Sequence, residues 1–546
     1  MQTTTSGEMF DSSAHRALDI RTDSAEEWVA ALPLANLGET CRLIFDSLTQ
    51  MNGTDASATQ RFKSLEPLRA PVHYLRDALR RRYTGVAFPL PEKTHRIAQL
   101  LREIQLEIAE GYQRAATQIL AQNGLRQDLN ILITALHRAL YYHGQALLTS
   151  YELYEDVAGQ RWQEIYTLYL EAERKALHLG VVKDAFKQGD SQTSVSGMFK
   201  QILLLALAYP HRLTQHEMGT VYTLLAKWAA QCQLYSVTDF NKPPGVFVVD
   251  LSSDTPPTYL IYNSTQAHAS TRLLDTTALS HSLRGFLAQA NQDASLASPR
   301  STALEESTLT REQLKRLLLS WAYPSKRGFS RSAQTTTLAI TFGLSASHAA
   351  VLPRQTNNVH PLHGALNSPR ITCQIINESA SGTCLRWEAG DTARARVGEL
   401  ITVYRGESSG ETVGIAVIRW LKCHDGGSVD FGVQLLVPSA TPVTVRLSDA
   451  GEADRDYLKA LLLPALPPGE ICETLLTPAF LYRPGDIVSV HTEQGENRYR
   501  LVRAVEATQA YVRFQFALLT ESSEETAAEG SQPPRRTDFD SVWSGL

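Results

Sequence analysis

The sequence predicts a multidomain α + β protein with an all-helical N-terminal array, a small mixed segment, an antiparallel β-barrel and a second small β module. Three observations indicate this fold class. Apolar residues recur at three- and four-residue spacing through residues 14–235. Beyond Pro324, short β-branched and aromatic runs alternate with glycine-bearing turns. At 546 residues the chain is too long for one core, and its 43% hydrophobic content suffices for several.

Composition excludes several classes of protein. The net charge of −5 gives no overall basic field for a nucleic acid polymer or an anionic membrane. The six cysteines are scattered without a C-x-x-C pair, which argues against a zinc ribbon or a redox motif. The N-terminus lacks the basic start and apolar core of a signal peptide, and no apolar run is long enough to span a bilayer. We expect a soluble, cytoplasmic protein with no cofactor and no membrane insertion.

The first region, residues 14–235, reads as a helical array. In RIAQLLREIQLEIAEGYQR, for example, apolar residues line one face of a helix. Helix breaks are expected at Gly53, residues 88–92, Gly124, Gly159 and Pro210. The pattern therefore predicts about seven successive helices, and a solenoid-like stack of hairpins is one arrangement that satisfies it.

Residues 240–295 form the small mixed α/β segment, since GVFVVDL and TYLIYN have strand patterns and HSLRGFLAQA has a helical one. A linker rich in small residues, 296–309, follows. Thr310 and Gln313 have the spacing of a capping box that opens a helix, which Pro324 ends.

Residues 310–447 contain that helix and the short strands of the predicted barrel. Three further strand patterns place a second β module at 455–520. The acidic tail, 521–546, is expected to be disordered. Its last residues, FDSVWSGL, have an apolar stripe at helical spacing; docking into an apolar groove and packing on the chain's own domain remain open interpretations.

A polar segment interrupts one β-like run. In IINESASGTCLRW (375–387), Asn377, Ser379 and Gly382 form the pattern Asn-x-Ser-x-x-Gly. Arg327 and Arg331 form Arg-x-x-x-Arg before the strand pattern TTTLAITFGL.

Together these two motifs resemble those of PilZ domains, which are bacterial β-barrel receptors for cyclic di-GMP. The resemblance covers about residues 326–447, and it implies a PilZ-like barrel in which Arg327, Arg331, Asn377, Ser379 and Gly382 bind cyclic di-GMP. The later run GGSVDFGVQLL looks like a closing strand of the same family.

The chemistry of these residue types agrees with that expectation. A cyclic dinucleotide presents two phosphates and two guanine edges, and the planar fork of arginine bonds to both. The amide of Asn377 is suited to a guanine edge and Ser379 offers a hydroxyl, while Gly382 allows close approach of the backbone. Binding would order the loop that contains Arg327 and Arg331, and this ordering could reposition the helical region.

Other interpretations stay open. Asn and Ser followed by Gly are ordinary turn chemistry, so the segment could merely connect two strands. An insertion at about 345–370 separates the two motifs by more residues than the family usually shows, and its role is not decided by the sequence. Arg354 and Arg370 in or beside it are additional candidate ligand contacts, although polar loop residues are the preferred interpretation. A second Arg-x-x-x-Arg, at Arg76 and Arg80, lies in a helical pattern and is expected to be a solvated face.

No catalytic centre or metal site is predicted, because the common phosphate-loop, dinucleotide and serine-hydrolase motifs are missing and no Cys or carboxylate accompanies His360 and His363. The sequence thus predicts a cyclic di-GMP-binding effector, not an enzyme, that engages an unidentified protein partner through its helical region or its tail. The alternative is a ligand-independent adaptor or scaffold whose PilZ-like domain has only a structural role.

Overall fold

The fold is taken from a computed structural model of the chain. It describes residues 16–21, 24–122, 128–157, 159–186, 192–236, 246–260, 268–292, 309–322, 332–333, 336–352, 369–379, 382–388, 395–406, 412–448, 457–465, 472–493 and 495–519.

The chain divides into two compact units. The first comprises Met1–Ser332, Arg386–Val397 and Arg419–Gly432, and the second comprises Ala333–Leu385, Gly398–Ile418 and Val433–Leu546.

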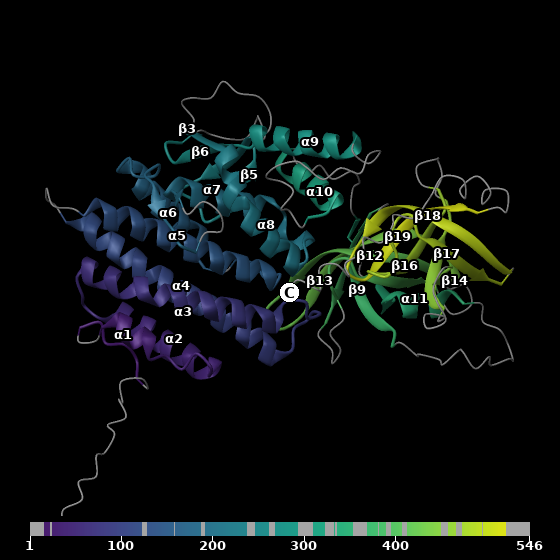
Figure 1. Cartoon of the computed structure of the whole chain (residues 1–546), viewed down its shortest axis with the longest axis horizontal. Helices are drawn as coiled ribbons and strands as arrows, with labels where there is room; N and C mark the ends of the chain where they lie inside the picture. The colour runs from purple at the N-terminus through teal and green to yellow at the C-terminus, as the bar shows by residue number, and fades with distance from the viewer. Residues whose placement is uncertain are drawn as a thin grey trace, which may run out of the picture. The chain divides into compact units, whose positions relative to one another are not determined.

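The N-terminal part of the first unit is helical, as predicted. Its helices are α1 (Ala25–Ala30), α2 (Leu37–Gly53), α3 (Ala58–Tyr83), α4 (Glu92–Ala121), α5 (Leu129–Glu152), α6 (Arg161–Arg174), α7 (Val195–Leu207) and α8 (Gln215–Trp228). The breaks expected at Gly53, residues 88–92, Gly159 and Pro210 fall at or between helix ends, and Gly124 lies outside the described residues. Helices α2 to α5 lie side by side in chain order (Figure 1), and each packs against the next. Two short strands, β1 (Val182–Lys183) and β2 (Gln192–Thr193), pair between α6 and α7.

A buried ion cluster ties α3 and α5 to the chain beside β1. The Asp184 carboxylate accepts a hydrogen bond from Arg69 Nη2 at 2.8 Å, and its other oxygen lies 3.0 Å from Arg138 Nη1. The side chain of Asp184 is 2% exposed and those of both arginines are 4% exposed. Burial raises the pKa of Asp184, but the two guanidinium groups outweigh it and hold the pKa below its ordinary value.

The Arg-x-x-x-Arg match in α3 is not a solvated face, so that expectation was wrong. Arg80 donates from Nε to the Glu152 carboxylate at 2.8 Å, and Tyr83 donates its hydroxyl to the same carboxylate at 2.7 Å. Glu152 is 1% exposed. Arg76 donates to the hydroxyl of Tyr141 at 3.1 Å. The arginines of α3 hold α5 in place because they satisfy polar groups that the packed helices bury.

The mixed segment contains a four-stranded sheet in the order β3-β6-β4-β5. Its strands are β3 (Gln233–Ser236), β4 (Val246–Asp250), β5 (Thr258–Tyr259) and β6 (Thr271–Asp275), followed by the paired helices α9 (Thr277–Gln292) and α10 (Arg311–Ala322). The predicted capping box is confirmed. Thr310 N donates to Gln313 Oε1 at 2.5 Å, and Gln313 N donates to Thr310 Oγ1 at 3.3 Å.

The predicted barrel is confirmed. Its strands are β7 (Ser332–Ala333), β8 (Thr337–Phe342), β9 (Ile371–Ser379), β10 (Gly382–Trp387), β11 (Leu400–Arg405), β12 (Thr412–Cys423) and β13 (Val429–Val437). They form a sheet in the order β10-β13-β12-β11-β8-β9-β7, and the additional pairing of β9 with β10 closes six of them into a ring.

The first unit also contains the ends of three barrel strands, because the division of the chain falls inside β10, β12 and β13. Within this unit the backbones of Phe88 and Ala395 form a two-way bridge at 2.9 and 3.1 Å. Cys423 N donates to Tyr154 O at 2.8 Å, and His211 Nδ1 lies 3.1 Å from Leu421 O. Hydrogen bonds therefore join helical-array residues to Ala395 and to the end of β12.

The second β module is a separate closed barrel in the order β14-β15-β16-β19-β18-β17. Its strands are β14 (Thr441–Leu447), β15 (Leu458–Leu463), β16 (Thr474–Pro478), β17 (Ile487–Thr492), β18 (Gly495–Ala507) and β19 (Tyr511–Leu518). The sequence grouped residues 441–447 with the first barrel, but β14 pairs with β15 and β17 of the second. The core of this barrel is aliphatic and aromatic, and includes Val445, Ala460, Leu475, Val488, Leu501 and Phe514.

The first part of the predicted insertion is a helix, α11 (Leu344–Val351), which packs against β11, β14 and β15. Ser347 is fully buried and its hydroxyl accepts a 2.8 Å hydrogen bond from Thr402 on β11. Residues 353–368 of the insertion, and the acidic tail with its terminal motif, lie outside the described residues. Within the described residues, no helix combines the length and the apolar character that a bilayer span requires.

We expect Asp184→Asn to lower the unfolding free energy of the helical region by about 3 kcal/mol at pH 7, because two buried guanidinium groups lose their nearest counter-charge and keep only the partly exposed Glu66. The pKa of Asp184 is depressed in the folded state, so its contribution is present above the ordinary value of 3.8 and is lost as pH falls through the lower folded value. The difference between wild type and variant should therefore narrow below about pH 4. Urea unfolding followed by circular dichroism at several pH values measures this difference in unfolding free energy. The control Asp77→Asn, at an exposed ion pair, should cost less than about 1 kcal/mol.

Candidate functional site

The Asn-x-Ser-x-x-Gly segment is a hairpin of the first barrel. Asn377 and Ser379 end β9, Gly382 begins β10, and the two strands pair. The structure thus brings these three predicted residues together at one turn. Arg327, Arg331 and Arg354 lie outside the described residues, so their roles stay predictions.

Gly382 is required by close packing of two strands. A Cβ atom at this position would lie 2.6 Å from the carbonyl oxygen of Val433 in β13. Real Cβ atoms do not approach backbone oxygen so closely, and a backbone atom in a sheet cannot rotate away. The glycine of the motif therefore has a role in folding whether or not a ligand binds.

Ser379 also has a local role. Its hydroxyl donates a 3.0 Å hydrogen bond to the carbonyl oxygen of Gly382 and so ties the two sides of the hairpin together. Serine commonly stabilises turns through such bonds to nearby backbone groups.

Asn377 differs from both, because its side-chain oxygen is buried and has no hydrogen-bond partner among the described residues. An unsatisfied buried acceptor costs roughly 1–3 kcal/mol. Packing of the hairpin does not explain an amide here, since a smaller apolar side chain would avoid this cost. The arrangement is the one expected of a group whose partner is a ligand.

A charged cluster that the sequence did not single out surrounds the hairpin. Arg405, the last residue of β11, forms an ion pair with Glu378, the residue between Asn377 and Ser379. The hydroxyl of Thr383 donates to the same Glu378 oxygen at 3.3 Å, and Arg405 Nη2 lies 3.4 Å from that hydroxyl. Arg405 is half exposed, at 49%. The motif therefore lies next to the guanidinium group of Arg405, which is paired with Glu378 but remains accessible to solvent.

Arg405 also lines a cavity of about 460 Å³ beside the hairpin. Its walls come from the start of β8, from β9 and from the end of β11: Thr336, Thr337, Leu338, Ala339, Thr372, Ile375, Tyr404, Arg405 and Gly406. The guanidinium group of Arg370 lies 3.9 Å from the centre of the Tyr404 ring. Arg370, an additional candidate in the sequence, thus stacks on a wall of this cavity. In the sequence, Arg405 is visible only as part of the Tyr-Arg-Gly that ends a strand pattern. That pattern does not show which residues lie beside Arg405 in the fold.

At the other end of β10, an ion pair fixes this strand against β13. Arg386 donates from Nε and Nη2 to the two oxygens of Asp430 at 2.7 and 2.8 Å. His424 Nε2 lies 2.9 Å from Asp430 as well. Burial raises the pKa of Asp430, but the hydrogen bonds from Arg386 and His424 prevail and lower it. The hairpin strand is therefore anchored at both ends.

The described part of the chain contains no group of three or more His, Cys, Asp or Glu side chains placed to hold a metal ion. His360 and His363 fall outside the described residues. All six cysteines are described, and all are free thiols.

We expect Gly382→Ala to destabilise the first barrel by about 1–3 kcal/mol, because the new methyl group must displace the β13 backbone. Asn377→Ala should leave stability within about 1 kcal/mol of wild type or raise it, because it removes an unsatisfied polar atom. Thermal melts measure both. Gly285→Ala, where the methyl group meets open space, is the control for the added carbon. Equal loss in both hairpin variants would mean that Asn377 has a structural role.

Comparison with known proteins covers nearly the whole chain. Residues 23–239 match the N-terminal domain of the cyclic-di-GMP receptor FimW, and residues 246–356 and 351–442 match its middle PilZ domain. Residues 443–519 match the FimW C-terminal β-barrel domain. The cyclic-di-GMP receptor FimW of Pseudomonas aeruginosa is 26% identical over 586 aligned residues, which cover 95% of each chain. With three matched domains in the same order, and with a PilZ hairpin where the sequence predicted one, the chain belongs to the FimW family of cyclic-di-GMP receptors.

Proposed function

We propose that this chain is a cytoplasmic effector that binds cyclic di-GMP at the first barrel and couples binding to protein–protein interaction through its helical region. The observation that carries the proposal is the buried, unpartnered amide oxygen of Asn377, held at the PilZ hairpin beside a cavity that Arg405 lines. The family match and the name of the Pseudomonas relative support the choice of ligand. The proposal includes no catalytic step.

In this proposal each group has a chemical role. Asn377 Oδ1 accepts a hydrogen bond from the donor edge of a guanine, which satisfies it. Arg327 and Arg331 bind phosphate or guanine through their planar forks. Tyr404, already stacked with Arg370, offers an aromatic face to a base.

Among the described residues, Arg405 is a cation in contact with the hairpin, and Glu378 sets its availability. Before binding, Arg405 is paired with the Glu378 carboxylate. A phosphate competes for the same guanidinium group and offers a bidentate, charge-assisted interaction. Glu378 therefore lowers the affinity of the site by holding Arg405 away from the ligand.

The hairpin also has a route to the helical region. Strand β10 begins at the motif residue Gly382 and ends at Trp387, and its last two residues belong to the first unit. That unit also contains the backbone bonds between the helical array and the chain around β12. In this proposal, ordering at the hairpin is transmitted to those bonds along β10 and across its sheet neighbours β13 and β12.

One observation favours the alternative, a ligand-independent adaptor. Ser379 and Gly382 both have structural reasons to be present, the hydroxyl bond across the turn and the contact with Val433. Only Asn377, among the described motif residues, lacks such a reason.

Isothermal calorimetry with cyclic di-GMP tests the proposal. Wild type should bind, whereas Asn377→Ala and Arg327→Ala/Arg331→Ala should each lose at least about tenfold in affinity, since each removes 1.4 kcal/mol or more of polar contact. The matched control Arg81→Ala/Arg483→Ala removes two exposed arginines elsewhere and should bind like wild type. Absence of heat with the folded wild type would favour the adaptor.

Glu378→Gln should tighten binding of cyclic di-GMP by about threefold to tenfold, because it releases Arg405 from an ion pair. Arg405→Ala should weaken binding. The control Glu496→Gln neutralises the partner of Arg446 in the second barrel and should change nothing. If Glu378→Gln and Arg405→Ala shift affinity in the same direction, Arg405 has no role in binding the ligand.

A further inference from the structure

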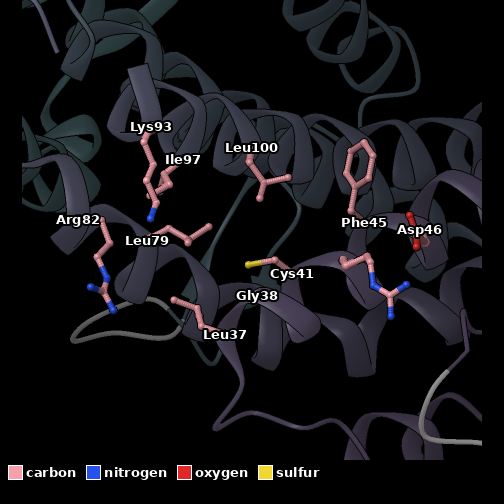
Figure 2. A pocket seen from close by; sticks show the side chains of 11 residues that line it. Leu37, Gly38, Cys41, Phe45, Asp46, Leu79, Arg82, Lys93, Ile97 and Leu100 are labelled. Atoms are coloured by element: carbon pink, nitrogen blue, oxygen red, sulfur yellow. The ribbon is translucent and has the colours of Figure 1, made fainter. Parts of the chain in front are cut away.

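The helical region has an apolar groove that the cyclic di-GMP site does not use. It lies between α2, α3 and α4 and has a volume of about 550 Å³. Figure 2 shows the apolar side chains of the three helices around one hollow. They are Leu37, Cys41 and Phe45 from α2, Leu79 from α3, and Ile97 and Leu100 from α4.

The floor of the groove is uncharged. Cys41 is buried, and this burial raises the pKa of its thiol to about 11, so it is neutral at physiological pH. Gly38 also lines the groove, and because it has no side chain the groove is wider between Leu37 and Cys41. A Cβ atom there would meet only Asn36 at 3.8 Å, so a larger side chain is sterically allowed.

The groove continues along α4. A second hollow of about 350 Å³ shares Lys93, Ile97 and Leu100 with the first. On α2 the lining residues run from Leu37 to Phe45, which is about 12 Å at the helical rise per residue. That length accommodates about two turns of another helix, with anchors three and four residues apart.

The rim of the groove is mainly basic. Arg42, Arg82 and Lys93 are exposed, and none has a hydrogen-bond or ion-pair partner among the described residues. Asp46 is the acidic residue that lines the first hollow, and Glu92, which pairs with Arg96, lines the second. Arg82 and Lys93 lie together at one end of the hollow, and Phe45 and Asp46 at the other (Figure 2). The chain as a whole has a net charge of −5, so this local excess of cations is not a general property of its surface.

We propose that this groove binds an amphipathic helix of a partner protein, with the helix's apolar stripe on the floor and its Asp or Glu residues against Arg82 and Lys93. An apolar floor of this length binds the stripe of a short helix, and unpaired cations at the rim select an acidic one and oppose a basic one. The inference rests on the proposed function in one respect, that the helical region is the interaction end of the effector.

Fluorescence anisotropy on the full chain tests the groove with two synthetic helical peptides. Both have the same leucine stripe at i, i+3, i+4 and i+7; one flanks it with Asp and Glu, the other with Lys. We expect the acidic peptide to bind at least about tenfold more tightly than the basic one, because two exposed charge pairs change sign.

Two variants locate the binding. Arg82→Glu/Lys93→Glu should weaken the acidic peptide about tenfold or more and strengthen the basic one. Its matched control, Arg81→Glu/Lys63→Glu, reverses two exposed charges of α3 that do not line the groove. Gly38→Leu should block both peptides while the far-ultraviolet spectrum stays unchanged, because leucine favours the helix and fills the groove.

Three results would overturn the proposal. The acidic peptide fails to bind at millimolar concentration, Gly38→Leu binds it like wild type, or the charge reversal leaves the preference unchanged. A peptide of this chain's own residues 537–546 is a further probe, and tighter binding by it than by the acidic peptide would reassign the groove to that segment. None of these measurements uses the nucleotide. A chain that binds the acidic peptide but gives no calorimetric heat with cyclic di-GMP would keep the groove and lose the sensor role.

Discussion

The contact between Gly382 and the carbonyl oxygen of Val433 is the constraint on which the candidate site depends. A six-stranded ring closes only if its last pairing, β9 with β10, forms while β10 also pairs with β13. Where β10 begins, there is no room for a side chain. Closure in turn determines where the end of β9 lies, and therefore where Asn377 and Glu378 are presented. Because β11 is also part of the ring, Arg405 is carried to the same place. The described part of the site is thus a product of barrel closure.

Much of this architecture could be predicted from local patterns. The helical spacing around Ile104 and Ile108, the glycine and proline breaks and the capping box at Thr310 each depend on neighbours in sequence. The structure agrees with each of them that lies in its described residues. Strands β8 to β13 and β17 to β19 were likewise visible as short β-branched runs, whereas β14, β15 and β16 were not identified. The hairpin was visible for the same reason, since Asn377, Ser379 and Gly382 lie within six residues. Residues 441–447 were grouped with the first barrel because the sequence does not reveal that they pair with β15 and β17 of the second.

The remaining features depend on residues that are distant in sequence. The ion pair between Arg405 and Glu378 joins residues 27 positions apart, and Arg80 meets Glu152 across 72 positions. An arginine at helical spacing looks the same in sequence whether solvent or a buried carboxylate faces it. The apolar groove was equally hidden, because Leu37, Leu79 and Ile97 each continue the ordinary apolar stripe of their own helix. Only the packing of three helices leaves these stripes incompletely covered.

Ser379 and Gly382 are needed for folding, whereas Asn377 is not, and this difference affects how the three positions change during evolution. A descendant that lost its nucleotide would still have to fold, so selection on folding would retain the serine that closes the turn and the glycine that makes room for β13. The asparagine, whose amide makes no stabilising contact within the described hairpin, could be replaced by an apolar residue without loss of stability. A sequence survey that takes Gly382 as the mark of a working receptor would therefore include proteins that no longer bind the nucleotide. The residue at position 377 distinguishes these proteins from receptors that still bind it.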